Sequence, residues 1–312
     1  MSIATITLNP AFDLVGRAGE ITLGRVNEVQ TLGVYPAGKG INVAKVLSDL
    51  GVESIILGGF LGEGNAGAFE QHFAKLNVLD RMQRVAGNTR TNVKLTADHG
   101  EVTDLNFSGF AISQAQWQQF CDDSLNYLRD VQLVAVCGSL PRGVSPQMFA
   151  QWLDAVRTTG AKVVLDTSKA ALHAGLGATP WLVKPNEHEL ADYLGKPLNS
   201  QDDIIAAAQQ LRAQGVENVV VSMGEHGALW VSQHGVLHAK PVAGIEVVST
   251  VGAGDSMVAG FIYGLSRNLA PEQVLATASA LGTLAVMQEN VGVAERHALE
   301  AMIDRITIEQ GQ

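Results

Sequence analysis

Ser249-Thr250-Val251-Gly252-Ala253-Gly254-Asp255-Ser256, followed at once by the apolar segment 257–265, is the stretch that decides the fold. Its two inner glycines let the backbone turn so that several N–H groups point at one spot beside a helix start, which creates an anion site. Asp255 falls in the first turn of that helix, where the helix dipole stabilises a carboxylate, so it could be a simple cap. The functional alternative is a catalytic base beside a site that neutralises a transferring phosphoryl group.

Composition narrows the choice of partners. The 312 residues include 21 Lys and Arg against 31 Asp and Glu, a formal net charge of −10. Nucleic acids and anionic membranes need clustered positive charge, so we expect neither as a partner. No apolar run approaches the ~18 residues of a membrane span, and the first residues do not resemble a signal peptide. Two cysteines, Cys121 and Cys137, are too few for a disulfide framework and favour a reducing, cytoplasmic location.

Short apolar runs alternate with helix-length amphipathic stretches along most of the chain. This alternation predicts an α/β fold with a mostly parallel sheet and helices on both faces. We expect the C-terminal part, 255–309, to be helical with breaks at Asn268 and at 290–292. The expected strands are 3–8, 54–60, 133–137, 162–165, 181–183 and 219–222, and the expected helices are 41–50, 66–76, 114–128, 146–158, 187–194 and 202–213.

Two stretches, 13–35 and 88–107, break the alternation with period-2 segments. In the second, the segments 91–95 and 102–106 are separated by the turn-like Asp98-His99-Gly100. We expect a small antiparallel sheet with polar residues on one face. It could be a lid, a dimer contact or an ordinary surface hairpin. With no internal repeat or linker, the chain is expected to form a single domain, 1–312, that carries this sheet.

Two glycine-rich stretches nearly match phosphate-binding motifs. Gly62-Glu63-Gly64-Asn65-Ala66-Gly67 is a G-x-G-x-x-G sequence with Asp80 about the right distance on, so an NAD-dependent dehydrogenase is one alternative and a plain strand-to-helix turn the other. Glu63, inside the loop, favours the plain turn. Gly33-Val34-Tyr35-Pro36-Ala37-Gly38-Lys39-Gly40 lacks the Ser or Thr with which a P-loop binds magnesium. Its glycines and Lys39 can still line an anion site at a helix start.

The sequence resembles the ribokinase-like, or PfkB, sugar kinase family at two distant motifs. V-G-A-G-D at 251–255 looks like its C-terminal signature, and Ala37-Gly38-Lys39-Gly40-Ile41-Asn42-Val43-Ala44 looks like its N-terminal one. Segments 5–13, 138–141, 183–189 and 222–228 are also similar to family segments, so the resemblance covers nearly the whole chain. It is closest to the phosphosugar branch. The resemblance implies a three-layer α/β sandwich with a small β-sheet lid.

The resemblance also implies roles for individual residues. Asp255 would take the proton from the sugar hydroxyl that attacks the γ-phosphorus of ATP, and the N–H groups of Gly252, Ala253 and Gly254 would stabilise the developing charge. Lys39 and Arg90 suggest that the sugar already carries a phosphate, because two cations suit a dianionic substrate. The implied substrate-binding residues are Asp13, Gly38, Lys39, Asn42, Arg90 and Ser139.

A second set of residues is implied for the nucleotide. Taken by themselves, Asn186 and Glu189 form a capping box; in the family they organise the magnesium-ATP phosphates through water, which makes Glu189 the candidate metal contact. The adenine pocket is expected near 290–292. ATP and Mg²⁺ are therefore the implied cofactors. The full nucleotide-binding set is Lys184, Asn186, Glu189, Ser222, Gly224, Gly227, Gly252 and Gly254. Ser249 replaces an acidic residue that many members carry at a monovalent-cation site, so potassium dependence is left open.

The implied reaction is the phosphorylation of fructose 1-phosphate at its 6-hydroxyl, giving fructose 1,6-bisphosphate. Tagatose 6-phosphate and fructose 6-phosphate are alternative substrates within the family, because one sequence does not reveal which end of the sugar faces the cations. A non-catalytic sugar-phosphate sensor is a further alternative, against which the intact Asp255 argues. We also expect a homodimer formed through the small sheet.

Overall fold

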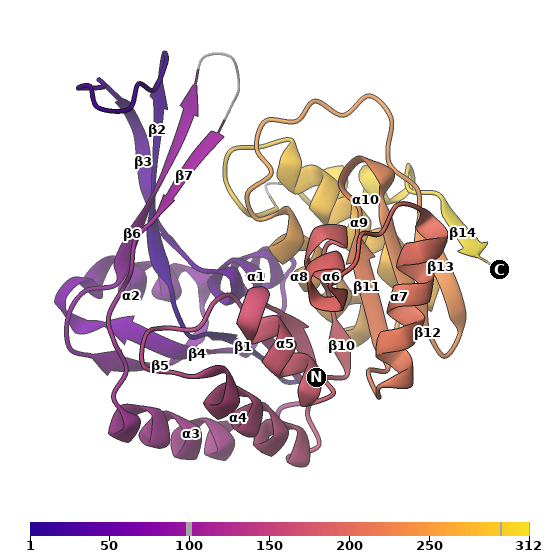
Figure 1. Ribbon diagram of the computed structural model, residues 1–312, viewed down its shortest axis with the longest axis horizontal. Helices are drawn as coiled ribbons and strands as arrows, with labels where there is room; N and C mark the ends of the chain where they lie inside the picture. The colour runs from indigo at the N-terminus through magenta and orange to yellow at the C-terminus, as the bar shows by residue number, and fades with distance from the viewer. Residues whose placement is uncertain (98–101, 294, 312) are drawn as a thin grey trace.

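A large sheet and a smaller one make up the structure, a computed structural model that describes residues 1–97, 102–293 and 295–311. The small sheet projects from one side of the helix-covered large sheet (Figure 1). In spatial order the large sheet contains β14 (Ile308–Gly311), β13 (Gly235–Ala239), β12 (Ala228–Ser232), β11 (Asn218–Ser222), β10 (Leu182–Val183), β9 (Lys162–Asp166), β8 (Leu133–Cys137), β1 (Ile3–Thr7), β4 (Ile55–Gly62) and β5 (Leu79–Val85). In this spatial order, the strands from β11 through β5 run parallel to one another. Strands β12, β13 and β14 each pair antiparallel with the neighbouring strand on the β11 side. The mostly parallel α/β architecture is confirmed.

Helices bury both faces of the large sheet. Along β8, Val134 and Val136 join one core while Leu133 and Ala135 join the other. Because neither face meets water, the strands read as continuous apolar runs. One face is covered by α3 (Gln114–Leu128), α4 (Pro146–Thr158), α5 (Lys169–Gly177), α6 (Glu187–Leu194) and α7 (Gln201–Ala213), and the other by α1 (Lys39–Asp49), α2 (Gly67–Leu76), α8 (Ala253–Ser266), α9 (Pro271–Val286) and α10 (Arg296–Ile303).

Every strand and helix expected from the first two thirds of the chain occurs, with ends shifted by at most two residues. The expectation that helix continues to Glu309 was wrong, because Ile308–Gly311 pairs with β13 as an antiparallel edge strand. The breaks at Asn268 and 290–292 fall between α8, α9 and α10.

The small sheet arises from the two segments expected to form it. Its order is β3 (Gln30–Ala37), β2 (Ala11–Ala18), β6 (Arg90–Ala97) and β7 (Val102–Asn106). The expectation of a purely antiparallel sheet was wrong, because β2 and β6 run parallel. They are joined by a long connection through β3, α1, β4, α2 and β5 and not by a hairpin. The predicted turn at 98–100 lies outside the described residues.

The two faces of the small sheet differ in polarity. Leu14, Val34, Val93 and Leu105 pair in one row across all four strands and form an apolar face. In the adjacent row, on the opposite face, Asp13, Tyr35, Asn92 and Asn106 are paired. The period-2 pattern therefore separates a polar face from an apolar one, as the sequence predicts.

The chain adds strands to the large sheet first on one side of β1 and then on the other. Strands β4 and β5 are added on one side of β1, and β8 to β11 on the other. Such a switch point opens a crevice at the carboxyl ends of parallel strands, where ligands bind in α/β proteins. Among the described residues, no helix has the length and hydrophobicity to span a membrane.

Candidate active site

Two helices begin at the carboxyl edge of the large sheet. Gly38 is the N-cap of α1 and Gly252 is the N-cap of α8, with φ angles of 147° and 77°. These values disfavour side chains. A Cβ atom on Gly252 would also lie 2.1 Å from Cγ2 of Val291. Glycine is therefore required at position 252 both by conformation and by space, and the free N–H groups of the first turn of α8 are available for an anion.

Asp255 sits in that first turn and is 4% exposed. Nδ2 of Asn42, from α1, donates a 2.7 Å hydrogen bond to Oδ2 of Asp255. Burial raises the pKa of Asp255 to about 6, against the opposing effects of Lys39 and of the Asn42 hydrogen bond. A carboxylate with a pKa just below neutral is ionised at physiological pH and still basic enough to accept a proton.

A buried carboxylate that the sequence analysis missed, Asp166, lies at the end of β9 and is 1% exposed. Nζ of Lys39 is 3.3 Å from its carboxylate oxygens, and Nζ of Lys184 is 3.4 Å from Oδ1. Burial opposes ionisation, but the two ammonium groups outweigh it and lower the pKa of Asp166. The sequence contained a signal for it, since Asp166 directly follows an apolar strand predicted to end at this edge.

The small sheet supplies Asp13 and Arg90 to its polar side. Nδ2 of Asn92 donates to Oδ1 of Asp13 at 3.3 Å. Burial raises the pKa of Asp13, while Lys94 and the Asn92 hydrogen bond oppose it. Arg90 donates to the carbonyl oxygens of Asn9, Pro10 and Phe107 at 3.2, 3.4 and 3.3 Å.

Asn9, which the sequence analysis did not single out, links the small sheet to the loop after β8. Its Nδ2 donates to Oγ of Ser139 at 3.1 Å, and its main-chain oxygen accepts from Arg90. The predicted residues Ser139 and Arg90 are thereby connected although 49 positions separate them in the chain. Asn9 ends up here because it directly follows β1 at the switch point.

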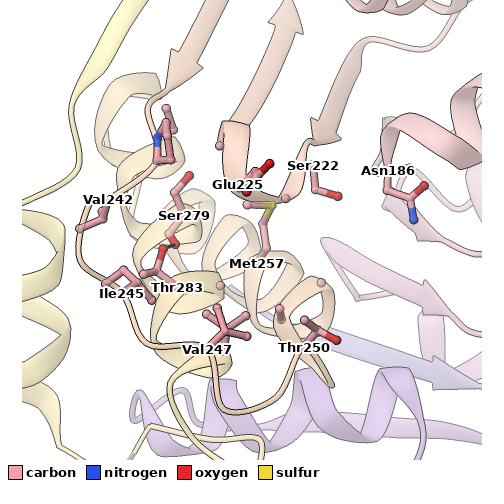
Figure 2. A pocket seen from close by; sticks show the side chains of 18 of the residues that line it. Asn186, Ser222, Glu225, Val242, Ile245, Val247, Thr250, Met257, Ser279 and Thr283 are labelled. Atoms are coloured by element: carbon pink, nitrogen blue, oxygen red, sulfur yellow. Dashed lines mark hydrogen bonds between the residues drawn. The ribbon is translucent and has the colours of Figure 1, made fainter. Parts of the chain in front are cut away.

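A cavity of about 660 Å³ extends from the start of α8 between α9 and the loop 240–250 (Figure 2). The predicted residues Asn186, Ser222, Gly224, Gly227 and Gly254 line it together with Ala253. Away from Asn186 and Ser222, the apolar side chains Val242, Ile245 and Val247 lie near Ser279 and Thr283 (Figure 2). Met257 and Val286 add to the apolar lining. An apolar slot with a few polar groups suits a purine base, and the glycines leave room for phosphates.

The other predicted nucleotide residues lie beside this cavity. The capping box is confirmed: Asn186 accepts from the Glu189 N–H at 2.8 Å, and Glu189 accepts from the Asn186 N–H at 3.0 Å. Nζ of Lys184 lies 3.2 Å from the position of a Cβ on Gly254.

Residues 290–292, where the adenine pocket was expected, do not line this cavity. In the described part of the chain the cavity is lined by α9 instead. Val291 packs against Gly252, and the Val293 N–H donates to Asp49 at 2.9 Å. The segment therefore braces α8 against α1.

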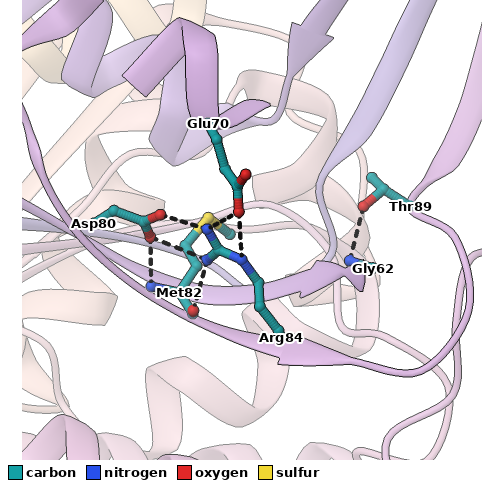
Figure 3. A network of polar contacts seen from close by, with 6 residues as sticks. All are labelled: Gly62, Glu70, Asp80, Met82, Arg84 and Thr89. Atoms are coloured by element: carbon teal, nitrogen blue, oxygen red, sulfur yellow. Dashed lines mark hydrogen bonds and ion pairs between the residues drawn. The ribbon is translucent and has the colours of Figure 1, made fainter. Parts of the chain in front are cut away.

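Protein atoms fill the space beside Gly62, the first glycine of the dinucleotide-like segment 62–67 (Figure 3). Oγ1 of Thr89 accepts from the Gly62 N–H at 2.9 Å, and a Cβ on Gly62 would lie 2.2 Å from the Thr89 nitrogen. Asp80, which a dehydrogenase would need for the ribose, forms an ion pair with Arg84 at 2.6 Å. Gly62 and Gly64 allow close packing against the segment 87–89, which accounts for these two glycines of the motif without a dinucleotide.

A glycine-capped helix start with free N–H groups, a buried carboxylate in its first turn and a nucleotide-sized cavity beside it are the features of a phosphoryl-transfer enzyme of α/β type. The chain belongs to the pfkB family of carbohydrate kinases, whose profile matches residues 6–297. It is 57% identical to a 1-phosphofructokinase from Haemophilus influenzae over 307 residues, which is 98% of each chain. Two structures of phosphofructokinase-2 from Escherichia coli, each 27% identical over 97% of this chain and 98% of the other, superpose well. The complex with potassium gives a TM-score of 0.88 and the tetrameric inhibited form 0.87.

Proposed function

We propose that this kinase transfers the γ-phosphoryl group of ATP to O6 of D-fructose 1-phosphate, giving fructose 1,6-bisphosphate and ADP. The observation that carries the proposal is the buried Asp255 at the start of α8, next to the nucleotide cavity and hydrogen-bonded to Asn42 of the sugar side. The acceptor follows from the relative at 57% identity that bears the name 1-phosphofructokinase.

In the proposed reaction, O6 attacks the γ-phosphorus while Asp255 accepts the hydroxyl proton. The bond from the γ-phosphorus to the bridging oxygen breaks, and ADP leaves with that electron pair. The N–H groups of Gly252, Ala253 and Gly254 stabilise the charge on the transferring group. The Ala253 N–H lies 3.5 Å from the Thr250 oxygen, a long contact that a phosphate oxygen can replace.

The sugar is proposed to lie between the polar face of the small sheet and the start of α1. Asp13, Gly38 and Asn42 would bind its hydroxyl groups. Ser139, Lys39 and Arg90 would bind the phosphate that it already carries. Because Asp166 is 3.3 Å from Lys39 and offsets part of its charge, we assign the larger share of phosphate binding to Arg90.

The donor is proposed to be ATP with Mg²⁺. The fit of the cavity supports ATP: its apolar end accommodates a base, and Ser279 contributes a buried hydroxyl oxygen without a partner among the described residues. The nucleotide-contacting residues would be Lys184, Asn186, Glu189, Ser222, Gly224, Gly227, Gly252 and Gly254. The described residues contain no cluster of three or more acidic, His or Cys ligands. This suits Mg²⁺, which is usually held by phosphates and water with one or two carboxylates, here Glu189 through water. When bound, Mg²⁺ neutralises phosphate charge.

We propose that residues 1–312 fold as one domain with the small sheet as a lid, and that two lids form a homodimer. The support is the apolar row described above, in which Val34 is 55% and Leu105 46% exposed. We also place the enzyme in the cytoplasm, which fits the free thiols of Cys121 and Cys137.

A pair of lid variants tests the dimer. Val34→Asp puts a charge on the apolar face, and Val102→Asp puts it on the opposite face of the same sheet at a similar exposure, 52%. Light scattering after gel filtration should show a monomer for Val34→Asp and the wild-type mass for Val102→Asp. Equal masses for both variants would contradict an interface on this face.

The function itself is tested by a coupled ADP-release assay with three acceptors. The value of kcat/KM should be at least about tenfold higher for fructose 1-phosphate than for fructose 6-phosphate or tagatose 6-phosphate. A preference for another acceptor would reassign the substrate. If none of the three phosphosugars stimulated ADP release, the proposed phosphosugar kinase activity would be refuted.

A further inference from the structure

The phosphate already present on the substrate needs more positive charge than the residues discussed above supply. A phosphate monoester carries between 1.5 and 2 negative charges at neutral pH, as a rough value. Lys39, one of the two cations expected for it, shares its charge with Asp166 at 3.3 Å. Arg90 by itself leaves a large part of the phosphate charge uncompensated.

A second guanidinium, that of Arg142, lies in the same cavity as Arg90. This cavity of about 670 Å³ at the base of the small sheet has a mixed lining. It contains both arginines, polar residues such as Asn88 and Ser108, and the apolar Val93, Phe107 and Phe110, and it meets the proposed sugar site at Arg90. Arg142 stands in the loop after β8, three positions beyond Ser139. Its side chain is exposed and can meet a ligand there.

The backbone around Arg142 is held in place by long-range bonds. The Ile112 N–H donates to the Arg142 oxygen at 2.8 Å, and Arg142 forms a β-bridge with Ala111. A Cβ on Gly109 would lie 3.4 Å from Cβ of Arg90. The segment before Ile112 therefore joins the two arginines.

Both guanidinium groups point at neutral acceptors. Nη2 of Arg142 donates to the Gly109 oxygen at 2.6 Å, and Nη1 of Arg90 donates to the Phe107 oxygen at 3.3 Å. Carbonyl oxygens do not offset the positive charge, whereas the Asp166 carboxylate offsets that of Lys39. A guanidinium has five donors, so the bond to Gly109 leaves Arg142 able to bind an anion.

We propose that Arg142 is a further specificity-determining residue: with Arg90, it binds the phosphate that the sugar carries before the reaction. The proposal rests on the proposed function, since it concerns the acceptor of that reaction. It explains how the enzyme can select a phosphorylated sugar although Lys39 is engaged by Asp166.

Two substitutions at one position separate charge from geometry. Arg142→Gln removes the charge and should raise KM for fructose 1-phosphate about 10- to 100-fold, the effect of losing a hydrogen bond to a charged group. Arg142→Lys keeps the charge but loses the planar fork, so its KM should lie between those of Arg142→Gln and the wild type. For both variants KM for ATP should stay within about twofold of the wild type, because Arg142 lies outside the nucleotide cavity.

Salt dependence gives a readout that a merely structural role would not change. Screening weakens a cation–phosphate contact, so KM for fructose 1-phosphate should rise less steeply with ionic strength in Arg142→Gln than in the wild type. Arg129→Gln is the matched control, since Arg129 is exposed and lines a different cavity, near the N-terminus. Its KM values and salt dependence should match the wild type.

Three outcomes would overturn the inference. One is a wild-type KM in Arg142→Gln. The second is equal impairment of Arg142→Gln and Arg142→Lys with an unchanged salt dependence, which would mean that Arg142 only braces Gly109. The third, decisive if Arg142→Gln melts too low to assay, is an Arg142→Lys variant with a wild-type KM and salt dependence. A wild type that prefers another phosphosugar would refute the proposed acceptor instead, and the same series with that sugar would still test Arg142.

Discussion

Replacing Asp255 by Asn tests the proposed base with little change in shape. The amide can still accept the hydrogen bond that Asn42 donates to the carboxylate at 2.7 Å, but it cannot take a proton. With a pKa of about 6, Asp255 is roughly 97% ionised at pH 7.5, so nearly all wild-type molecules have an active base. We expect kcat to fall about 10²- to 10⁴-fold, or about 3–5 kcal/mol in activation free energy.

The same substitution should stabilise the fold. Burial raises the pKa of Asp255 from 3.8 to about 6, so the ionised form costs about 3 kcal/mol of folding stability above pH 6. The neutral amide of the Asp255→Asn variant avoids this cost. The gain in unfolding free energy should be present above pH 6 and disappear as the pH falls from 6 towards 4, where the wild-type carboxyl is protonated in the folded state.

The assay combines coupled ADP release with calorimetric ATP binding and urea unfolding at several pH values. Asp203→Asn is the matched control, because Asp203 also lies in the first turn of a helix but is exposed; it should leave kcat unchanged. Retention of more than about a tenth of the activity by Asp255→Asn would refute the base assignment. A large loss of ATP affinity would show that Asp255 binds the nucleotide.

Three further predictions follow from the same site. The value of kcat/KM should fall about tenfold per pH unit below pH 6, because protonation of Asp255 removes the base. Asn42→Leu should move this acidic fall to higher pH, because it removes a hydrogen bond that favours the carboxylate. A wild-type profile that falls only near pH 4 would contradict both predictions. Gly252→Ala places a side chain at a φ of 77° and against Val291, so thermal melting should show a lower midpoint and kcat should drop at least about tenfold; a wild-type melting curve would argue against this packing. Asp166→Asn leaves Lys184, which is 4% exposed, without its counter-charge, so the unfolding free energy in urea should decrease by about 3 kcal/mol; an unchanged midpoint would show that the pair is not stabilising.

The sequence analysis missed helix α5 and the strands β5, β12 and β13. Helix α5 contains two glycines and forms because Leu172 and Leu176 are buried in the core, a tertiary effect that overrides weak propensity. Strand β5 carries the charged residues Asp80, Arg81 and Arg84, as suits the edge of a sheet. Helix α5 and strand β5 thus have weaker patterns than elements that bury a full face. Strands β12 and β13 are almost completely buried, so for them the apolar run was present in the sequence and was overlooked.

The sequence by itself determined what depends on neighbours along the chain. The buried strands, the capping box of Asn186 and Glu189, and the glycine-capped start of α8 all follow from residue types a few positions apart, because periodicity and helix caps are local properties. The two family signatures lie in such local segments. They therefore sufficed to predict the class of fold and the place of Asp255, the proposed base, at the start of a helix.

Tertiary structure decided the contacts between distant segments. Lys39, Asp166 and Lys184 come from three separate strand ends and helix starts. The order of strands in the sheet brings each ammonium group within 3.4 Å of the Asp166 carboxylate. The parallel pairing of β2 with β6 and the meeting of Arg90 and Arg142 around one loop arise in the same way. Such pairings depend on how the sheet is assembled, which no local pattern encodes, and so the distribution of charge in the site became visible only in the folded chain.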